Sequence, residues 1–294
     1  MTDWININMV GRGFYEPVRF SGFPEIKESL ASGHIQATFM VAPMALALRE
    51  QGLPIKIVSL GHRDGTAIMV HKDSNIHSFN DLKGKKIAVP TRYSNQYLII
   101  FRGLRDNGLL PKDVTLLEMP PPEMPTALET RSVDAICSGE PFMAKTQMAG
   151  FGRVLYQAKD LWPNFISCVL VVREDVIREH EDWVQQLVSG IAKSGKWIDE
   201  DMENRLALAS VVSEKYYKQK PDLLRYVLST PPDRVTYSNL RLARKDFQVI
   251  EQLAEEAGLL KGRVSFDDYA DTRFTDRTQD AQAYAWHVPG EAAK

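Results

Sequence analysis

The stretch that most constrains this chain is residues 81–97 (DLKGKKIAVPTRYSNQY), because it contains a complete strand–loop–helix unit. A polar turn at 81–85 leads into the short apolar run 87–89, and after a loop an amphipathic helix is expected over 94–107. A short apolar run between turn signals, followed by apolar residues spaced about 3.6 apart, predicts a strand and then a helix. Units of this kind build α/β sheets.

The loop of this unit, residues 90–96, has the composition of a ligand-binding loop. Open α/β sheets bind ligands at the carboxyl ends of their strands. Ser94 or Asn95 would cap a helix whose free N–H groups attract an anion. The sequence therefore predicts a site for a small, anionic, oxygen-rich ligand. A capped surface helix without any ligand is the alternative that this stretch alone leaves open.

Composition excludes several classes of protein. The 36 Lys and Arg against 38 Asp and Glu give a net charge of −2, so there is no basic surface that would predict a nucleic-acid partner. No apolar run approaches the roughly 20 residues of a membrane span, so we expect no such span. The start, MTDW, lacks the basic and apolar regions of a signal peptide. We expect a periplasmic or extracytoplasmic location if a signal peptide was removed, and a cytoplasmic one if the chain is complete as written.

The residues that usually carry catalysis or bind metals form no recognisable motif. Cys137 and Cys168 would form one bridge in an oxidising compartment or remain two buried thiols, and we favour the second. His62, His71 and His77 lack ligand spacing on one helix, and neither CxxC, HExxH nor GxSxG occurs. We expect no metal, no cofactor and no catalytic residue.

The order of the expected elements indicates two α/β lobes. Strands alternate with helices up to residue 173, which favours mostly parallel sheets. The first strand is expected at 4–10, and long helices at 183–199, 205–219, 221–228 and 245–257. Residues 30–37 and 129–135 share a pattern of helix end and short strand, each followed by a Pro-led helix, which suggests two related lobes. Residues 272–294 are polar and aperiodic, as in a surface tail.

Three segments together resemble the periplasmic solute-binding proteins of nitrate, sulfonate, taurine and bicarbonate ABC importers. They are residues 30–47, the turn and strand 79–89 (FNDLKGKKIAV), and 133–142, where the pair Glu140 and Pro141 opens a helix. Members of that family usually begin with a strand and a helix ahead of the strand expected here at 4–10, and they usually have an aspartate where Gln36 stands.

The resemblance implies an α/β, two-lobed, periplasmic-binding-protein-like fold of type II, with mostly parallel sheets flanked by helices and a cleft between the lobes. Lobe 1 would comprise residues 1–70 and 173–271, lobe 2 residues 71–172, and residues 272–294 the tail. The crossings between lobes would lie near 67–71 and 168–172. Such a cleft closes on its ligand by a hinge motion.

The resemblance also implies a function. The chain would be the solute-binding component of an ABC importer. It would bind a small anionic or heteroaromatic ligand, such as a sulfonate, nitrate or a related organic compound. It would deliver this ligand to permease and ATPase subunits without catalysing a reaction. The alternative is a cytoplasmic enzyme on the same fold, similar to pyrimidine-precursor synthases or chorismate-dehydrating enzymes.

Four loops are expected to face the cleft: 39–44, 61–66, 90–96 and 138–142. Arginine side chains bind carboxylates and related anions with two hydrogen bonds. Glu140 would accept from a ligand, or would lie at the N-terminus of its helix, where a negative charge is favoured. Aromatic and methionine side chains would form apolar walls, although Phe39 and Met40 also suit a plain core. The expected ligand-binding set is Phe39, Met40, Pro43, Met44, His62, Arg63, Thr91, Arg92, Tyr93, Ser94, Asn95, Glu140 and Phe142.

Overall fold

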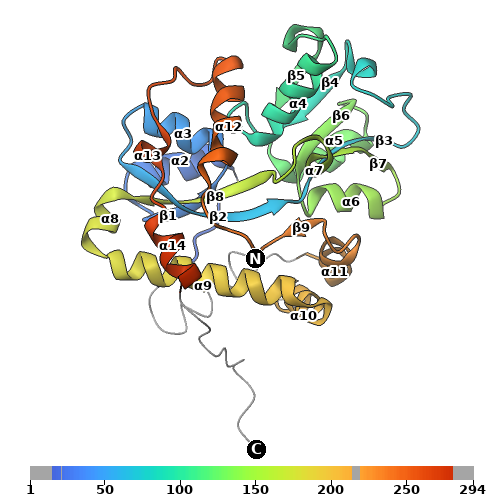
Figure 1. The fold of residues 1–294 in the computed structure, drawn as a ribbon. Helices are drawn as coiled ribbons and strands as arrows, with labels where there is room; N and C mark the ends of the chain where they lie inside the picture. The colour runs from blue at the N-terminus through green and yellow to red at the C-terminus, as the bar shows by residue number, and fades with distance from the viewer. Residues whose placement is uncertain (1–14, 21, 214–218, 281–294) are drawn as a thin grey trace, which may run out of the picture.

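The structure, a computed structural model, describes residues 15–20, 22–213 and 219–280. These residues form two α/β lobes, each built on one sheet (Figure 1). The first sheet has the strand order β1 (Ala37–Met40), β8 (Ile166–Arg173), β2 (Ile55–Asp64) and β9 (Val235–Thr236). The second has the order β5 (Thr115–Glu118), β4 (Lys86–Val89), β6 (Ala135–Gly139), β3 (Thr66–His71) and β7 (Gly152–Gln157). The strand expected at 4–10 lies outside the described residues.

The strand pairs of the first sheet are antiparallel and the second sheet is mixed, so the expectation of mostly parallel sheets was wrong. In the first sheet β8 runs antiparallel to both β1 and β2. In the second, β4 is parallel to β5 and β6, whereas β3 is antiparallel to β6 and β7. Among the named strands, the parallel pairing that the alternation of strands and helices predicts is found only between β4 and its neighbours β5 and β6. The strands β3 and β8, which begin just after the two crossings between lobes, run antiparallel to both of their neighbours.

Helices cover the faces of both sheets. Those of the first lobe are α2 (Phe23–Ala31), α3 (Ala42–Glu50), α8 (Glu174–Glu179), α9 (Glu181–Glu200), α10 (Met202–Val212), α11 (Pro221–Ser229), α12 (Arg244–Glu256), α13 (Phe266–Tyr269) and α14 (Arg273–Asp280). Those of the second are α4 (Asn95–Asp106), α5 (Met124–Glu129), α6 (Phe142–Met148) and α7 (Ala158–Leu161), with short 3₁₀ turns at Asn80–Leu82, Pro111–Asp113 and Pro121–Glu123. Among the described residues no helix is long and apolar enough to cross a membrane.

Two expected boundaries differ from the observed ones. The first crossing between lobes is at Gly65, because β3 already belongs to the second sheet, and β8 belongs wholly to the first. The stretch 272–280 of the expected tail includes α14, which packs on α9 through hydrogen bonds from Gln185 to Phe274 and Thr278. An amphipathic face of only eight residues is too short to stand out in a polar sequence.

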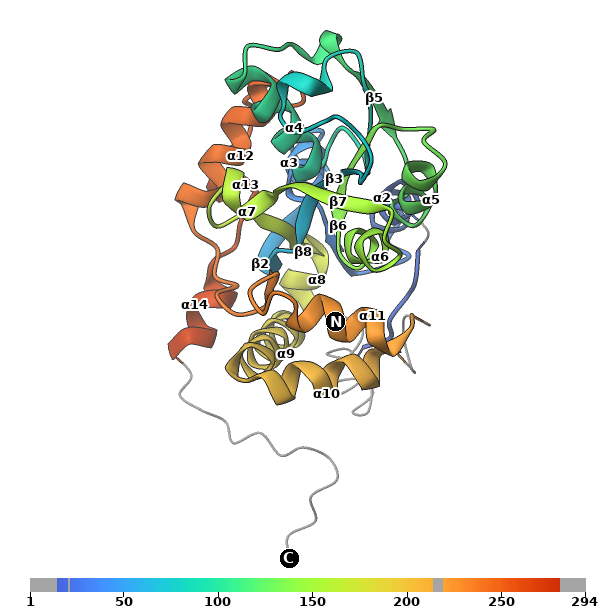
Figure 2. The same cartoon turned by 90° about the vertical axis from the view of Figure 1, so that its right-hand side faces the viewer.

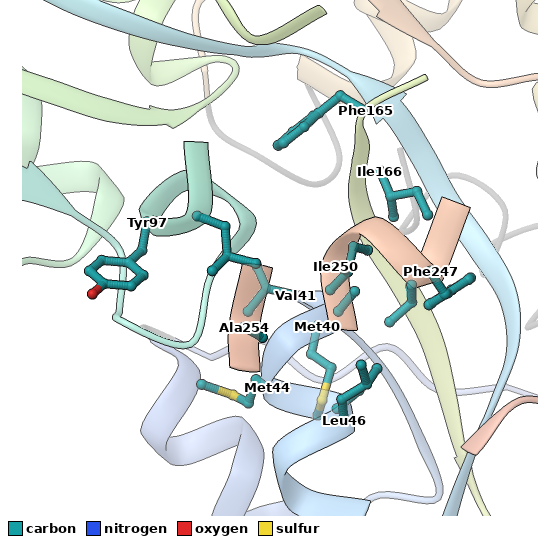
Figure 3. Packing of buried hydrophobic residues seen from close by; sticks show 14 of the residues in the cluster. Met40, Val41, Met44, Leu46, Tyr97, Phe165, Ile166, Phe247, Ile250 and Ala254 are labelled. Carbon is teal, nitrogen blue, oxygen red and sulfur yellow. The ribbon is translucent and has the colours of Figure 1, made fainter. Parts of the chain in front are cut away.

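One apolar core runs through both lobes. It includes Met40 and Leu46 from the first lobe and buried residues of α4 from the second. Figure 3 shows Phe247 and Ile250 of α12 lying near Met40 and Leu46, with Tyr97 of α4 in the same cluster. The two lobes are therefore in apolar contact beside the strands that join them.

The long helix α9 approaches the backbone of the segment that follows β9. A Cβ atom at Gly195 would lie 1.9 Å from the carbonyl oxygen of Tyr237. Only glycine allows this approach, although glycine inside a helix costs about 1 kcal/mol relative to alanine.

We expect Gly195→Ala to lower the free energy of unfolding by about 1–3 kcal/mol, because the added methyl group overlaps a backbone atom that cannot rotate away. Denaturant unfolding measures the effect. Lys196→Ala, at the exposed neighbouring position of the same helix, is the control. A stabilised Gly195→Ala variant would contradict the close approach.

Candidate functional site

The start of α4 is organised as the sequence predicts. Ser94 is the N-cap residue and is fully buried. Its Oγ accepts a hydrogen bond from the backbone N–H of Tyr97 at 3.1 Å and donates one to the carbonyl of Thr91 at 2.6 Å. The Oγ1 atom of Thr91 accepts from the N–H of Tyr93 at 3.3 Å. These hydroxyl groups hold the loop in shape, and the helix start presents its backbone N–H groups beside it.

Two amide side chains connect the start of α4 to both crossings between the lobes. Asn95 donates to the carbonyl of Ile166, the first residue of β8. Gln96 donates to Oγ1 of Thr66, the first residue of β3, at 3.1 Å. Both residues are buried, and their remaining amide oxygens have no hydrogen-bond partner among the described residues. The predicted ligand loop therefore lies where the chain passes between lobes.

The two predicted arginines differ in what they bind. Arg63 lies on β2 with a side chain only 5% exposed, because β2 extends to Asp64 through the expected loop 61–66. Its guanidinium donates to the carbonyls of Asn239 and Asn164 at 3.0 and 2.8 Å. It also donates to the carboxylate of Asp246 at 2.8 Å. All three guanidinium nitrogens of Arg63 are thus hydrogen-bonded within the first lobe, and ligand binding by Arg63 stays a prediction.

Arg92, by contrast, is open to a ligand. Its side chain is 60% exposed, and its nearest carboxylate is that of Glu118 at 3.8 Å. An exposed pair at this distance contributes little to stability. Of the two arginines, Arg92 alone keeps a guanidinium that can turn towards an anion.

Glu140 is engaged inside the protein. Its side chain is buried, one oxygen accepts from the guanidinium of Arg234, and the other accepts from the N–H of Ala144 in the first turn of α6. Burial raises the pKa of Glu140, against the opposing effect of Arg234. The structure thus places Glu140 at the N-terminus of α6, as the alternative expects, and its role as a ligand acceptor stays an untested prediction.

Most of the predicted apolar wall is core. Met40, Pro43 and Met44 are buried, so the alternative that the sequence left open for Met40 holds. Tyr93 packs at the edge of the main core and Phe142 at the edge of the second-lobe core. These side chains stabilise the lobes on either side of the crossings instead of lining an open pocket.

Phe39 lines a cavity of about 820 Å³ on the first lobe. The cavity lies between residues 15–20, α2, the strands β1 and β8, and helices α8 and α9. Trp183, 41% exposed, forms part of its wall and stacks on His180 with ring centroids 3.9 Å apart. The sequence does not reveal this cavity, because its walls come from segments far apart in the chain.

Near Phe39 the structure brings a thiol and an imidazole together. Cys168 Sγ lies 3.2 Å from Nδ1 of His62, and a Cβ at Gly61 would meet that sulfur at 2.5 Å. Burial raises the pKa of Cys168 to about 12 and lowers the pKa of His62 to about 4. The pair is therefore neutral at pH 7. Both cysteines are free thiols, and no group of three or more metal-binding side chains occurs in the described part of the chain.

The protein-family model that matches this chain is described as the NMT1-like family and covers residues 8–213. The nitrate/nitrite binding protein NrtA of Nostoc sp. is 23% identical over 223 residues, which are 69% of this chain and 50% of the relative. A putative aliphatic sulfonates-binding protein of Bacillus subtilis is 28% identical over 214 residues, 71% of this chain and 63% of the relative. The chain thus spans half to two thirds of the length of these curated relatives.

Solved structures share the fold. The periplasmic nitrate-binding protein NrtA from Synechocystis has a TM-score of 0.85 at 16% identity, over 96% of this chain and 86% of that one. The desulfurization enzyme DSZB has a TM-score of 0.59 at 16% identity, over 83% of this chain and 85% of that one. The fold is that of periplasmic-binding-protein-like solute-binding proteins, and an enzyme also uses it.

The cap of α4 generates one prediction. Ser94→Ala should lower the free energy of unfolding by about 0.5–2 kcal/mol, because the N–H of Tyr97 and the carbonyl of Thr91 both lose a buried partner. Arg92→Ala should change it by less than about 0.5 kcal/mol, since Arg92 is exposed. Chemical denaturation measures the free energy of unfolding of both variants. Equal losses of this free energy would contradict the assignment of Ser94 as the cap.

The lowered pKa of His62 generates another prediction. Between pH 6.5 and about 4 the unfolded chain binds a proton at His62 that the folded protein excludes, so stability falls as pH falls through this window. Above pH 6.5 the effect is absent. In His62→Gln this part of the acid destabilisation should disappear, whereas His77→Gln, at an exposed position, should keep it. Urea unfolding at pH 4.5 and 7.5 makes the comparison, and parallel losses in all three proteins would refute it.

Proposed function

The chain belongs to the NMT1-like family, and on this basis we propose that the protein is the solute-binding component of an ABC importer. The observation that carries the proposal is the position of α4. Its capped N-terminus is bonded through Asn95 and Gln96 to both crossings between the lobes. A ligand bound there would contact the elements that must move when two lobes close.

The chemistry of this region suits a small anion. Backbone N–H groups at the start of a helix favour negative charge, and Arg92 supplies a guanidinium beside them. Relatives are named for nitrate, nitrite and aliphatic sulfonates, which are oxyanions that such donors recognise. We propose a nitrate, a sulfonate or a related organic anion as the ligand, held by Arg92, Thr91 and the start of α4.

Binding without catalysis fits the structure better than an enzyme does. Cys168 and His62 form the thiol–imidazole contact that an enzyme would need, but burial keeps the thiol protonated and the imidazole neutral. An activated cysteine has a lowered pKa instead. We therefore assign the neutral pair of Cys168 and His62 a structural role. The enzyme on the same fold is the second candidate function.

The proposal carries partners and a location with it. A solute-binding component delivers its ligand to permease and ATPase subunits, and we propose these as the protein partners. Because the relatives include periplasmic binding proteins, we also propose an extracytoplasmic location.

A thermal-shift screen of the 294-residue chain against nitrate, bicarbonate, taurine, alkanesulfonates, aromatic carboxylates and pyrimidines tests the function. A ligand at a hundred times its Kd adds about 2.7 kcal/mol to the free energy of unfolding, which raises the midpoint measurably. We expect one class of anion to produce the shift and Arg92→Ala to reduce it.

Arg178→Ala is the matched control, because Arg178 is similarly exposed, at 69%, on α8 of the first lobe. Absence of a shift with every compound, or equal shifts in both arginine variants, would count against the proposed site. Turnover of a ligand would favour the enzyme.

A further inference from the structure

The first crossing between the lobes is a single residue, Gly65, between β2 and β3. Its N–H donates to the carbonyl of Arg234 and its carbonyl accepts from the N–H of Glu140, both at 2.8 Å. Its φ of +72° lies in the left-handed region, and a Cβ there would be 2.8 Å from Val235. Both backbone hydrogen-bonding groups of the crossing residue are therefore occupied, and a side chain would find no room.

The two residues that bind Gly65 also bind each other. Nη1 of Arg234 donates to Oε1 of Glu140 at 2.6 Å, with side chains 3% and 6% exposed. The same nitrogen donates to Oε1 of Gln147 at 3.0 Å, and Nε donates to the carbonyl of Thr230 at 2.7 Å. Because both side chains are almost wholly buried, separating this pair would leave buried charges unpaired, which is strongly unfavourable.

The ion pair joins the two lobes. Arg234 immediately precedes β9, which pairs with Arg63 and Asp64 of β2 in the first sheet. Glu140 follows β6 of the second sheet and precedes α6. Helix α11 lies beside α6 in both views (Figures 1 and 2), and Ala144 of α6 shares an apolar cluster with α10 and α11. The crossing, the ion pair and this cluster form one continuous contact between the lobes.

Two other ion pairs between the lobes lie closer to solvent. Lys159, in the second crossing, pairs with Asp233 at 2.6 Å with side chains 26% and 73% exposed. Arg105 of α4 pairs with Glu256 of α12 with side chains 44% and 35% exposed. Exposed pairs break and re-form in water at little cost. Separating the charges of these two pairs therefore costs less than separating Glu140 from Arg234.

We propose that Glu140 and Arg234 are positioning residues that fix the pivot of lobe closure at Gly65. The lobes turn about this point with the ion pair of Glu140 and Arg234 intact, while the exposed pair of Arg105 and Glu256 breaks and re-forms. The pair thereby sets which inter-lobe angles the ligand-free protein samples. This inference rests on the proposed function only where it concerns ligand affinity.

Spin labels on the exposed residues Lys112 and Arg178, each replaced by cysteine in a Cys137→Ser/Cys168→Ser background, report the inter-lobe distance. Glu140→Gln, which keeps the shape but removes the charge, should broaden the distance distribution of the ligand-free protein. Lys159→Met, which removes the exposed pair nearby, should leave the distribution unchanged. Arg234→Lys keeps the positive charge but loses the several hydrogen-bond donors of the guanidinium group. The width of its distance distribution should lie between those of Glu140→Gln and wild type.

Ligand binding gives an independent readout. If the population of closure-competent protein falls to about a tenth in Glu140→Gln, the apparent Kd rises about tenfold. If Glu140→Gln lowers only the unfolding midpoint and leaves the distance distribution unchanged, the ion pair does not fix the pivot and the proposal is wrong. If wild type binds no compound of the panel but Glu140→Gln still broadens the distribution, the pivot stands and the proposed function fails. If Glu140→Gln does not fold, the Arg234→Lys distribution decides in the same way.

Discussion

The geometry of this protein depends on how the chain passes between its two sheets. Two α/β lobes with separate sheets share one apolar core, so they cannot be independent bodies. The first crossing, Gly65, is one residue long, and the buried ion pair of Glu140 and Arg234 lies beside it. Buried charges tolerate only arrangements in which they stay paired. The relative position of the lobes is therefore set by polar contacts at the crossing and by the shared apolar core beside it.

The start of α4 belongs to the same arrangement. Its amide side chains bond to the first residues of β3 and β8, so the end of the helix that attracts anions is attached to the strands that join the lobes. Binding at this end can change the balance between inter-lobe angles, because any ligand shifts an equilibrium by its difference in affinity for the two states. Arg92 adds an exposed positive charge whose nearest carboxylate, that of Glu118, is 3.8 Å away.

Three charged residues illustrate how burial divides structural from functional roles. Arg63 and Glu140 are buried, and each spends its hydrogen-bonding groups on partners inside the protein. Arg92 is exposed and has one distant carboxylate. All three follow strands in the sequence and look equally suited to a ligand site. Burying a charge is unfavourable unless partners compensate it, so the first two have partners and the third remains available.

Local units could be read from the amino-acid sequence: the helix that starts after Ser94, the glycine-terminated helix before β1, and the strand–loop–helix order of an α/β protein. These follow from periodicity and from hydrogen bonds between residues three or four positions apart, which a reader of the sequence can count. Only the tertiary structure decided the mixed pairing of the sheets, the passage at Gly65, and the partners of Arg63 and Glu140. Apart from Ala144, which is four residues from Glu140, those partners are 94 to 183 residues away in the chain. No local pattern encodes such distances, because they depend on how whole elements pack.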